Sequence, residues 1–219
     1  MKKSIIFFIF LILSCSLVFA HQPRIAFDKE ISFSNPIVVE SPEISKAYYG
    51  ELNGEPDYYR IESSEEFNLY LNILTPDLPD SRTDFIAEVI HNNETIILLD
   101  GTDQEWTAFF EPFARDNYLK GPEFEETISS GSYIIKISNK ENSGRYSLAV
   151  GKIESFTPVE TIKTFVYLPS IKKNFFEKSP LSAFTNIFTL FSLIIIVALI
   201  SITFYIIKKL TNKKHEKKR

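Results

Sequence analysis

The longest uncharged segment of the chain, from Phe184 to Ile207, constrains the fold more than any other feature. It contains 24 residues, with the sequence FTNIFTLFSLIIIVALISITFYII. An α-helix rises about 1.5 Å per residue, so this segment would be roughly 36 Å long, enough to cross a hydrocarbon core of about 30 Å. The sequence therefore predicts one C-terminal transmembrane α-helix over 184–207.

The charges that follow this segment predict its orientation. Residues 208–219 contain seven Lys or Arg residues and a single acidic residue, Glu216. An excess of basic residues on one flank holds that flank in the cytoplasm. We therefore expect a single-pass protein of the cell membrane, with a short basic cytoplasmic tail over 208–219 and everything before Phe184 outside.

The N-terminal residues are consistent with export. A short basic start and an apolar stretch over 5–13 precede the sequence Val18-Phe19-Ala20, which has the character of a cleavage site. This pattern is typical of a signal peptide, here 1–20. An alternative remains open, because Ile12-Leu13-Ser14-Cys15 resembles a lipoprotein cleavage box in which Cys15 would carry the lipid.

The exported part, 21–183, is long enough for one domain with a stalk. Cys15 is the only cysteine of the chain, so the exported part contains no disulfide bond and must be stabilised by its core. The chain has 20 Phe and 10 Tyr residues, which are sufficient to form a hydrophobic core. The exported part carries 15 basic and 27 acidic residues, a net charge near −12. Such a surface repels nucleic acid, which we exclude as a partner.

Short stretches of β-branched and aromatic residues, many with period-two alternation, follow one another through the exported part. Turn sequences rich in Asn, Gly, Pro and Asp separate them. The pattern predicts an all-β fold, an antiparallel β-sandwich over 21–155. Between Thr102 and Gly121 no strand is evident, and we expect an ordered aromatic excursion over an open end of the sandwich. The predicted strands are 24–32, 37–39, 44–52, 57–62, 68–74, 84–90, 95–99, 123–128, 133–138 and 145–150.

Two sequence motifs resemble a known family. The first is Tyr49-Gly50 followed by Asp57-Tyr58-Tyr59, and the second is a predicted final hairpin in which Gly131-Ser132-Tyr133 begins one strand and Gly144-Arg145-Tyr146 begins the next. Together they resemble the opening and closing of a prepeptidase C-terminal-type domain, over about 44–151. The resemblance implies a jelly-roll-like sandwich that serves as an accessory module of secreted or surface proteins.

The segment between the sandwich and the predicted span, 156–183, alternates aromatic and aliphatic residues with lysines and is interrupted by three prolines. Two interpretations remain open for this juxtamembrane segment. It could lie in the lipid headgroup layer, because lysine can reach the interface while its stem covers apolar surface. It could also be a linker whose apolar residues pack under the domain.

The exported part offers little for catalysis. Its only histidines are His21 and His91, and it contains no sequence motif of a nucleophile, a phosphate loop or a zinc site. Two acidic loops could offer oxygen ligands to calcium, although their spacing matches no calcium-loop signature. Aromatic residues of the 102–121 segment could form a platform for a partner. The candidate calcium ligands are Asp77, Asp80, Asp84, Asp100 and Asp103, and the candidate aromatic residues are Trp106, Phe109, Phe110 and Tyr118.

Taken together, these features predict a non-catalytic, membrane-anchored extracytoplasmic module that recognises a protein or glycan, or has a structural role, at the cell surface. Apart from the calcium considered above, we expect no cofactor. The alternative is an accessory subunit of a membrane-associated hydrolase or redox complex. A hydrolase that uses scattered Asp and Glu residues is a third class.

Overall fold

A computed structural model of the chain describes residues 21–155 and 157–185, together with residues 197, 201, 202, 204, 205 and 208. The predicted signal peptide, most of the predicted span and all but the first residue of the predicted tail lie outside the described residues. Within the part that is described, no helix combines the length and the apolar character that crossing a bilayer requires.

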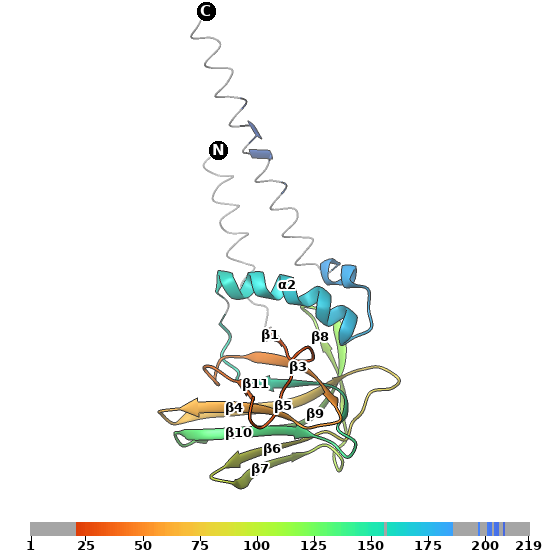
Figure 1. Ribbon diagram of the computed structural model, residues 1–219. Coiled ribbons are helices and arrows are strands. Elements are labelled where there is room, and N and C mark those ends of the chain that lie inside the picture. Colours follow the sequence, from red (N-terminus) through yellow and green to blue (C-terminus); the bar gives the residue numbers. More distant parts are fainter. Residues whose placement is uncertain are drawn as a thin grey trace, which may run out of the picture.

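The described residues form two β-sheets that face each other, which confirms the prediction of an all-β sandwich (Figure 1). Neighbouring strands are antiparallel except for two parallel edge pairs, β1 with β3 and β2 with β4. In order, the six-stranded sheet contains β1 (Gln22–Ile25), β3 (Lys46–Asn53), β11 (Ser143–Val150), β5 (Phe67–Pro76), β9 (Asp116–Ile128) and β8 (Thr107–Glu111). The five-stranded sheet contains β2 (Ile37–Val38), β4 (Asp57–Ser63), β10 (Gly131–Ser138), β6 (Ile86–His91) and β7 (Glu94–Asp100).

The main core lies between the two sheets and follows the period-two pattern of the strands. In β10 the side chains of Tyr133, Ile135 and Ile137 point into this core, and each is at most 3% exposed. Residues on one face of a strand recur at every second position, so the alternation in the sequence identifies the buried face. In β11 the alternate residues Tyr146, Leu148 and Val150 are fully buried in the same core.

The expected final hairpin is wrong, because β10 and β11 belong to different sheets. β10 pairs with β4 and β6, whereas β11 pairs with β3 and β5. Both strands have an apolar face, and the sandwich buries those faces against each other instead of placing the strands side by side. Gly144 has a positive φ, 101°, at the start of β11, directly after the arch that joins the two sheets. Asn139 stabilises this arch by accepting from the Ser143 amide at 3.1 Å.

The segment between Thr102 and Gly121 also differs from the prediction, because it contains β8 and the first part of β9. These strands form the far edge of the six-stranded sheet, where β8 pairs only with β9 among the described strands. The first four residues of β8 are exposed, so its sequence has no alternation between apolar and polar residues. Without that alternation, the strand could not be identified from its pattern.

The predicted juxtamembrane segment forms helix α2 (Pro158–Asn174) and a 3₁₀ helix, η1 (Pro180–Phe184). Thr157 is the N-cap of α2 and accepts from the Glu160 amide at 3.2 Å, while Pro158 occupies the first turn, where a missing N–H costs nothing. Figure 1 shows α2 lying across the six-stranded sheet, on the side of the sandwich opposite β6 and β7. The folded unit therefore continues past Ser155.

Candidate functional site

A second apolar cluster lies between α2 and the outer face of the six-stranded sheet. The sheet contributes residues that alternate with those of the main core, and α2 contributes its last turns together with the two phenylalanines that follow it. Because the sheet is covered on both faces here, eight consecutive residues of β5, from Leu69 to Pro76, are buried. The cluster consists of Tyr70, Leu74, Tyr118, Ala149, Ile171, Phe175 and Phe176. The packing interpretation of the juxtamembrane segment is therefore confirmed for one face of the helix.

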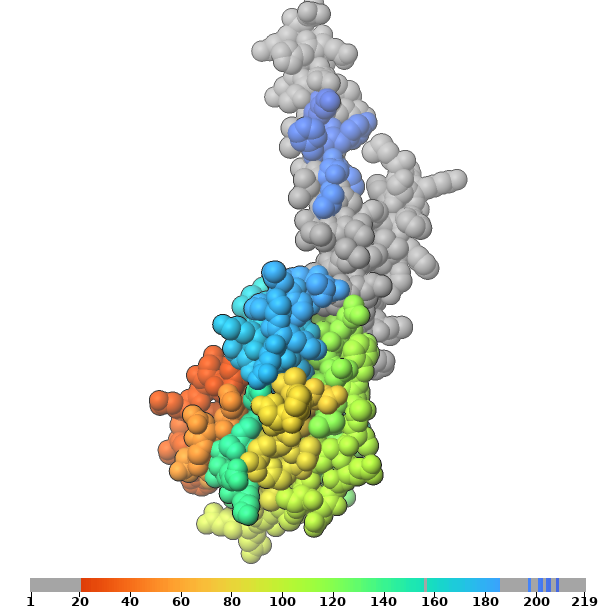
Figure 2. All heavy atoms as spheres, turned by 90° about the vertical axis from the view of Figure 1, so that its right-hand side faces the viewer, coloured from red at the N-terminus to blue at the C-terminus, as the bar shows by residue number. Residues whose placement is uncertain are grey.

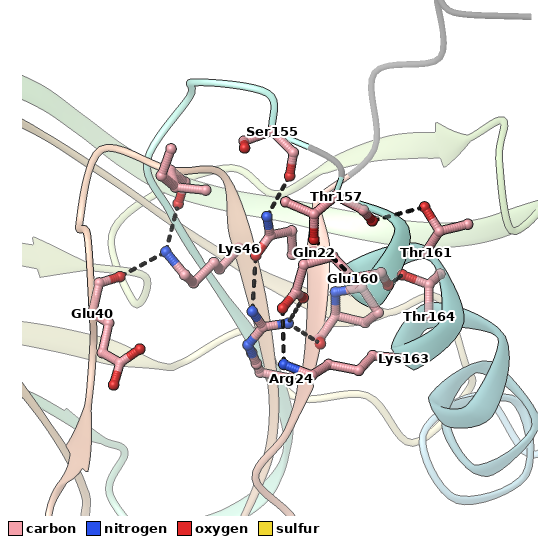
Figure 3. A network of polar contacts seen from close by, with 12 residues as sticks. Gln22, Arg24, Glu40, Lys46, Ser155, Thr157, Glu160, Thr161, Lys163 and Thr164 are labelled. Carbon is pink, nitrogen blue, oxygen red and sulfur yellow. Dashed lines mark hydrogen bonds and ion pairs between the residues drawn. The ribbon is translucent and has the colours of Figure 1, made fainter.

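Polar contacts fix the first turn of α2 to the edge strand β1 (Figure 3). The guanidinium of Arg24 forms an ion pair with Glu160 at 2.8 Å and donates to the Gln22 side chain at 2.8 Å. Gln22 in turn donates to the backbone carbonyl of Ser155. Lys163 also pairs with Glu160, at 2.9 Å. These contacts hold the start of the helix in one register on the sheet.

A buried charge cluster fixes the other end of α2. The carboxylate of Asp116, on β9, is fully buried and accepts from Lys172 and from Lys178, both at 2.7 Å. The ammonium of Lys172 also donates to the carbonyl of Ala114. Burial is the main reason that the pKa of Lys172 lies below its usual range, and the Asp116 carboxylate opposes that shift. Removal of one partner would leave a charge in the interior, which is costly.

Between α2 and the sheet lies a cavity of about 240 Å³. Small side chains on the sheet, Ala47, Ala149 and Ser147, leave this space, and tyrosines form its walls together with Leu168 of the helix. Glu111 and the hydroxyls of Tyr49 and Tyr118, which line the cavity, are already engaged in hydrogen bonds. Glu111 accepts from the backbone amides of Phe113 and Ala114 at 2.8 and 2.6 Å, and burial raises its pKa.

The tyrosine pair of this cavity does not favour proton transfer. The hydroxyls of Tyr49 and Tyr118 bond to each other at 2.9 Å, and burial raises the pKa of Tyr118 well above its usual range. A general acid or base needs a pKa near the working pH. What the cavity provides is therefore space and apolar surface, and we assign it no catalytic step.

The outer face of α2 exposes apolar side chains. Val159, Ile162 and Val166, at helical spacings of three and four, are 60%, 64% and 65% exposed. Leu181 and Phe184 of η1 are exposed as well. We call these five residues the helix face. Figure 2 shows residues 157–185, in light to dark blue, as one continuous cap at the upper end of the folded part. A helix that packs on a sheet normally exposes polar residues on its outer side, so this pattern is unusual.

A second exposed apolar surface lies on the outer face of the five-stranded sheet, on the opposite side of the sandwich. Ile96 and Leu98 of β7 are 47% and 58% exposed, and Val38 of β2 is 48% exposed. Ile90 and Ile134 are half-buried residues of β6 and β10 that pair with each other across the sheet. We call these five residues the sheet patch. Exposed apolar surface of this kind marks an interaction site more often than isolated residues do.

The sequence did not predict the sheet patch, and for the helix face it offered only the possibility that residues 156–183 lie in the headgroup layer. The residues of the sheet patch are spread over four strands. The pairing of β10, β6 and β7 brings Ile134 and Ile90 close to Ile96 and Leu98, whereas Arg60 of β4 lies between Ile134 and Val38. The helix face was hidden because both sides of α2 carry apolar residues, which obscures the amphipathic signal. The available signal was the spacing of Val159, Ile162 and Val166 in a segment that was already considered for contact with headgroups.

The four predicted partner-binding aromatic residues do not form one platform. The indole of Trp106 donates to the Gly101 carbonyl at 2.9 Å and lies against Gly101 and Gly121, where a Cβ would approach the ring to within 2.8 Å. Tyr118 is buried beneath α2. Phe109 and Phe110, at the edge strand β8, are 41% and 52% exposed and are still available to a partner.

The predicted calcium ligands are spread over two loops, and three of the five are engaged by neighbouring residues. Arg82 donates to both carboxylate oxygens of Asp84, at 2.9 and 2.5 Å, and Arg145 lies 3.3 Å from Asp80. Asp100 accepts from Thr102 and thereby closes its own turn. Among the described residues, no group of three or more His, Cys, Asp or Glu side chains is arranged to hold a metal ion. For Asp77 and Asp103 the calcium assignment stays a prediction.

The motif residues meet in the main core. The hydroxyl of Tyr146 donates to Asp57 at 2.6 Å and bonds to the hydroxyl of Tyr59 at 2.7 Å. Gly50 lies under the Tyr146 ring, where a Cβ would stand 2.4 Å from a ring carbon. Gly50, Asp57 and Tyr59 therefore all contact Tyr146, and the packing of this one ring accounts for the motif residues. Burial raises the pKa of Asp57 to about 6.

Comparisons with known proteins add little to this description. No protein-family model matches the sequence, and no curated protein matches it. Among solved structures, the pre-peptidase C-terminal domain of collagenase from Bacillus anthracis aligns at 10% identity with a TM-score of 0.33, over 57% of this chain and 97% of that domain. A β-glucosidase from Paenibacillus barengoltzii aligns at 8% identity with a TM-score of 0.27, over 59% of this chain and 13% of that enzyme. These TM-scores are too low to support an argument about family or function, so the description of the fold rests on the strand pairing.

Proposed function

We propose that the chain is a non-catalytic, single-pass membrane protein whose extracytoplasmic sandwich binds a protein or glycan partner. The observation that carries the proposal is the sheet patch, which lies on the side of the sandwich away from α2 and presents Ile96 and Leu98 to solvent. The uncharged segment 184–207 and the basic tail supply the anchor and its orientation. Engagement of Glu111 and the tyrosine pair in structural hydrogen bonds supports the non-catalytic assignment.

The topology can be tested with intact cells that express the full chain with a tag after Arg219. Added protease is expected to digest the domain and to spare the tag, because the basic tail lies in the cytoplasm. A digested tag with a protected domain would reverse the orientation. Full digestion of both in unbroken cells would remove the anchor from the proposal.

Partner binding can be tested by cross-linking and capture of the full chain from mild detergent. Ile96→Glu/Leu98→Glu replaces two exposed residues of the sheet patch and should abolish capture of the partner. The control, Ile153→Glu, changes an apolar residue that is 52% exposed and belongs to neither the sheet patch nor the helix face, and it should retain capture. Equal recovery of the partner by both variants would show that the sheet patch is not the binding surface.

The identity of the captured molecule also decides between the proposal and its alternative. A membrane-associated hydrolase or redox subunit that depends on the sheet patch would assign this chain as an accessory subunit. A glycan or another surface protein would assign it as a recognition module. Phe109 and Phe110, at the edge of the other sheet, are tested in the same experiment by Phe109→Ser/Phe110→Ser.

A further inference from the structure

Two features of the helix face indicate that it contacts something outside the folded domain. The face lies on a helix whose opposite side is already buried against the sheet, so packing within the domain does not explain the exposed Val159, Ile162 and Val166. It is also continuous in sequence with the uncharged segment that begins at Phe184. We propose that the helix face rests on the lipid bilayer and orients the sandwich on it. This inference rests on the proposed anchor.

The distance between the domain and the predicted span supports a bilayer as the occupant. Ala183 is fully buried in a cluster with Leu168 of α2 and Ala114. The uncharged segment starts at the next residue, and consecutive Cα atoms are only about 3.8 Å apart. A helix that enters the membrane at this point therefore leaves no free linker, and α2 must lie close to the headgroups.

Charge also distinguishes this part of the molecule. Residues 157–185 contain four lysines and two glutamates, whereas residues 21–156 contain 11 basic and 25 acidic residues. By helical spacing, Lys163 and Lys173 lie on the same side of α2 as Ile162 and Val166. Lys163 also pairs with Glu160, and Lys172 and Lys178 pair with Asp116. A helix with an apolar face flanked by lysines binds at the interface of a bilayer that contains anionic lipids.

The low amphipathic signal of α2 follows from the same geometry. One side of the helix packs on the sheet through Leu168 and Ile171, and the other would pack on acyl chains through Ile162 and Val166. A helix between two apolar environments needs apolar residues on both sides. Contact with the bilayer would hold α2 and η1 against the membrane and the sheet patch away from it, accessible to a partner in the aqueous phase.

The test uses the full chain with Cys15→Ser, which removes the only native cysteine, in vesicles of phosphatidylcholine and phosphatidylserine. An environment-sensitive fluorophore is attached at Ile162→Cys or, on the opposite side, at Leu98→Cys. These two sites are similarly exposed, at 64% and 58%. Lipids with a nitroxide near the headgroup should quench the label at position 162 by about twofold, as expected for a residue in the interface. They should leave the label at position 98 unchanged. Val159→Cys provides a second label on the helix face.

Flotation of the vesicles separates the possible failures. If the chain floats with the vesicles and neither label on the helix face is quenched, the inference is overturned while the anchor stands. If the chain does not float, both the anchor and the inference fall. Equal quenching at positions 162 and 98 would show that the sandwich has no fixed orientation and would also overturn the inference. In vesicles of phosphatidylcholine alone, weaker quenching at position 162 would support a role for the lysines, and unchanged quenching would restrict the contact to the apolar residues.

Discussion

The two faces of the six-stranded sheet are buried in different ways. The inner face packs on the other sheet through an apolar core that contains one polar network, Asp57 with Tyr59 and Tyr146. The outer face packs on α2 through aromatic residues, with charged contacts at both ends of the helix. The inner face is covered by the five-stranded sheet, whereas the outer face is covered only by α2, which follows the last strand. We therefore expect α2 to be as necessary to the fold as a strand.

The largest effect should come from removal of the helix. A fragment of residues 21–155 exposes the outer face of β5 and β11 and loses the burial of Leu168, Ile171, Phe175 and Phe176. Each such side chain contributes about 1.5–3 kcal/mol, so the free energy of unfolding should fall by at least ~6 kcal/mol relative to residues 21–185. Urea denaturation of the two fragments measures this difference. Equal midpoints would show that the sandwich is complete without α2.

Within the inner core, Tyr146→Ala should be the most damaging single change. The substitution removes a fully buried ring and leaves Asp57 and Tyr59 without their shared partner. The expected loss is about 3–5 kcal/mol in the free energy of unfolding. Tyr146→Phe keeps the ring and should cost about 1–2 kcal/mol, the value of the lost hydrogen bonds. Thermal melting measures both, and equal losses would contradict the role of the hydroxyl network.

On the outer face, Asp116→Ala should cost about 3 kcal/mol, because it leaves Lys172 charged and buried. Asp84→Ala is the matched control, since its ion pair with Arg82 is partly exposed and should contribute less than about 1 kcal/mol. Asp116→Ala/Lys172→Met should recover most of the loss. Hydrogen exchange should show faster exchange in α2 and unchanged protection in β10. A loss of protection spread evenly over both would argue against a separately docked helix.

The polar network of the inner core should make the free energy of unfolding depend on pH through Asp57. The pKa of Asp57 is about 6 in the folded protein and near 3.8 when unfolded, so the folded state binds the proton more tightly. Its contribution to stability is present at low pH and is lost as the pH rises from about 4 to 6. The loss should be about 2–3 kcal/mol. The difference in unfolding free energy between the protein and Asp57→Asn measures it, because other groups cancel. A difference that does not change with pH would contradict the burial of the carboxyl.

The smallest expected effect concerns calcium. Asp80, Asp84 and Asp100 are engaged by neighbouring side chains, so calcium should produce only a small, unsaturated rise in melting temperature, shared with magnesium. The same titration with Asp77→Asn/Asp80→Asn and with Asp100→Asn/Asp103→Asn serves as the control. A specific site occupied at 100 times its dissociation constant would add about 2.7 kcal/mol. A saturable calcium response that one pair removes would therefore establish a site.

The sequence by itself determined the strands whose two faces differ. In β10 and β11, Tyr133 and Tyr146 begin apolar series at every second position, and such a series has only one way to face a core. The same rule failed for β8, whose exposed residues do not alternate. The strand predicted over 68–74 is confirmed as β5, although its burial on both faces leaves no single face for the alternation to identify. The signal peptide, the membrane span and the tail were also predicted from the sequence, and they remain predictions.

Only the tertiary structure decided which strands are neighbours and what covers the outer face of the six-stranded sheet. β10 and β11 are consecutive in sequence but lie in opposite sheets, because their apolar faces are buried against each other across the core. The ion pairs of Asp116 with Lys172 and Lys178 join residues 56 and 62 positions apart. Local sequence sets the period of a segment. The choice of a partner depends on which buried charges and apolar faces are satisfied together, and that is a property of the whole fold.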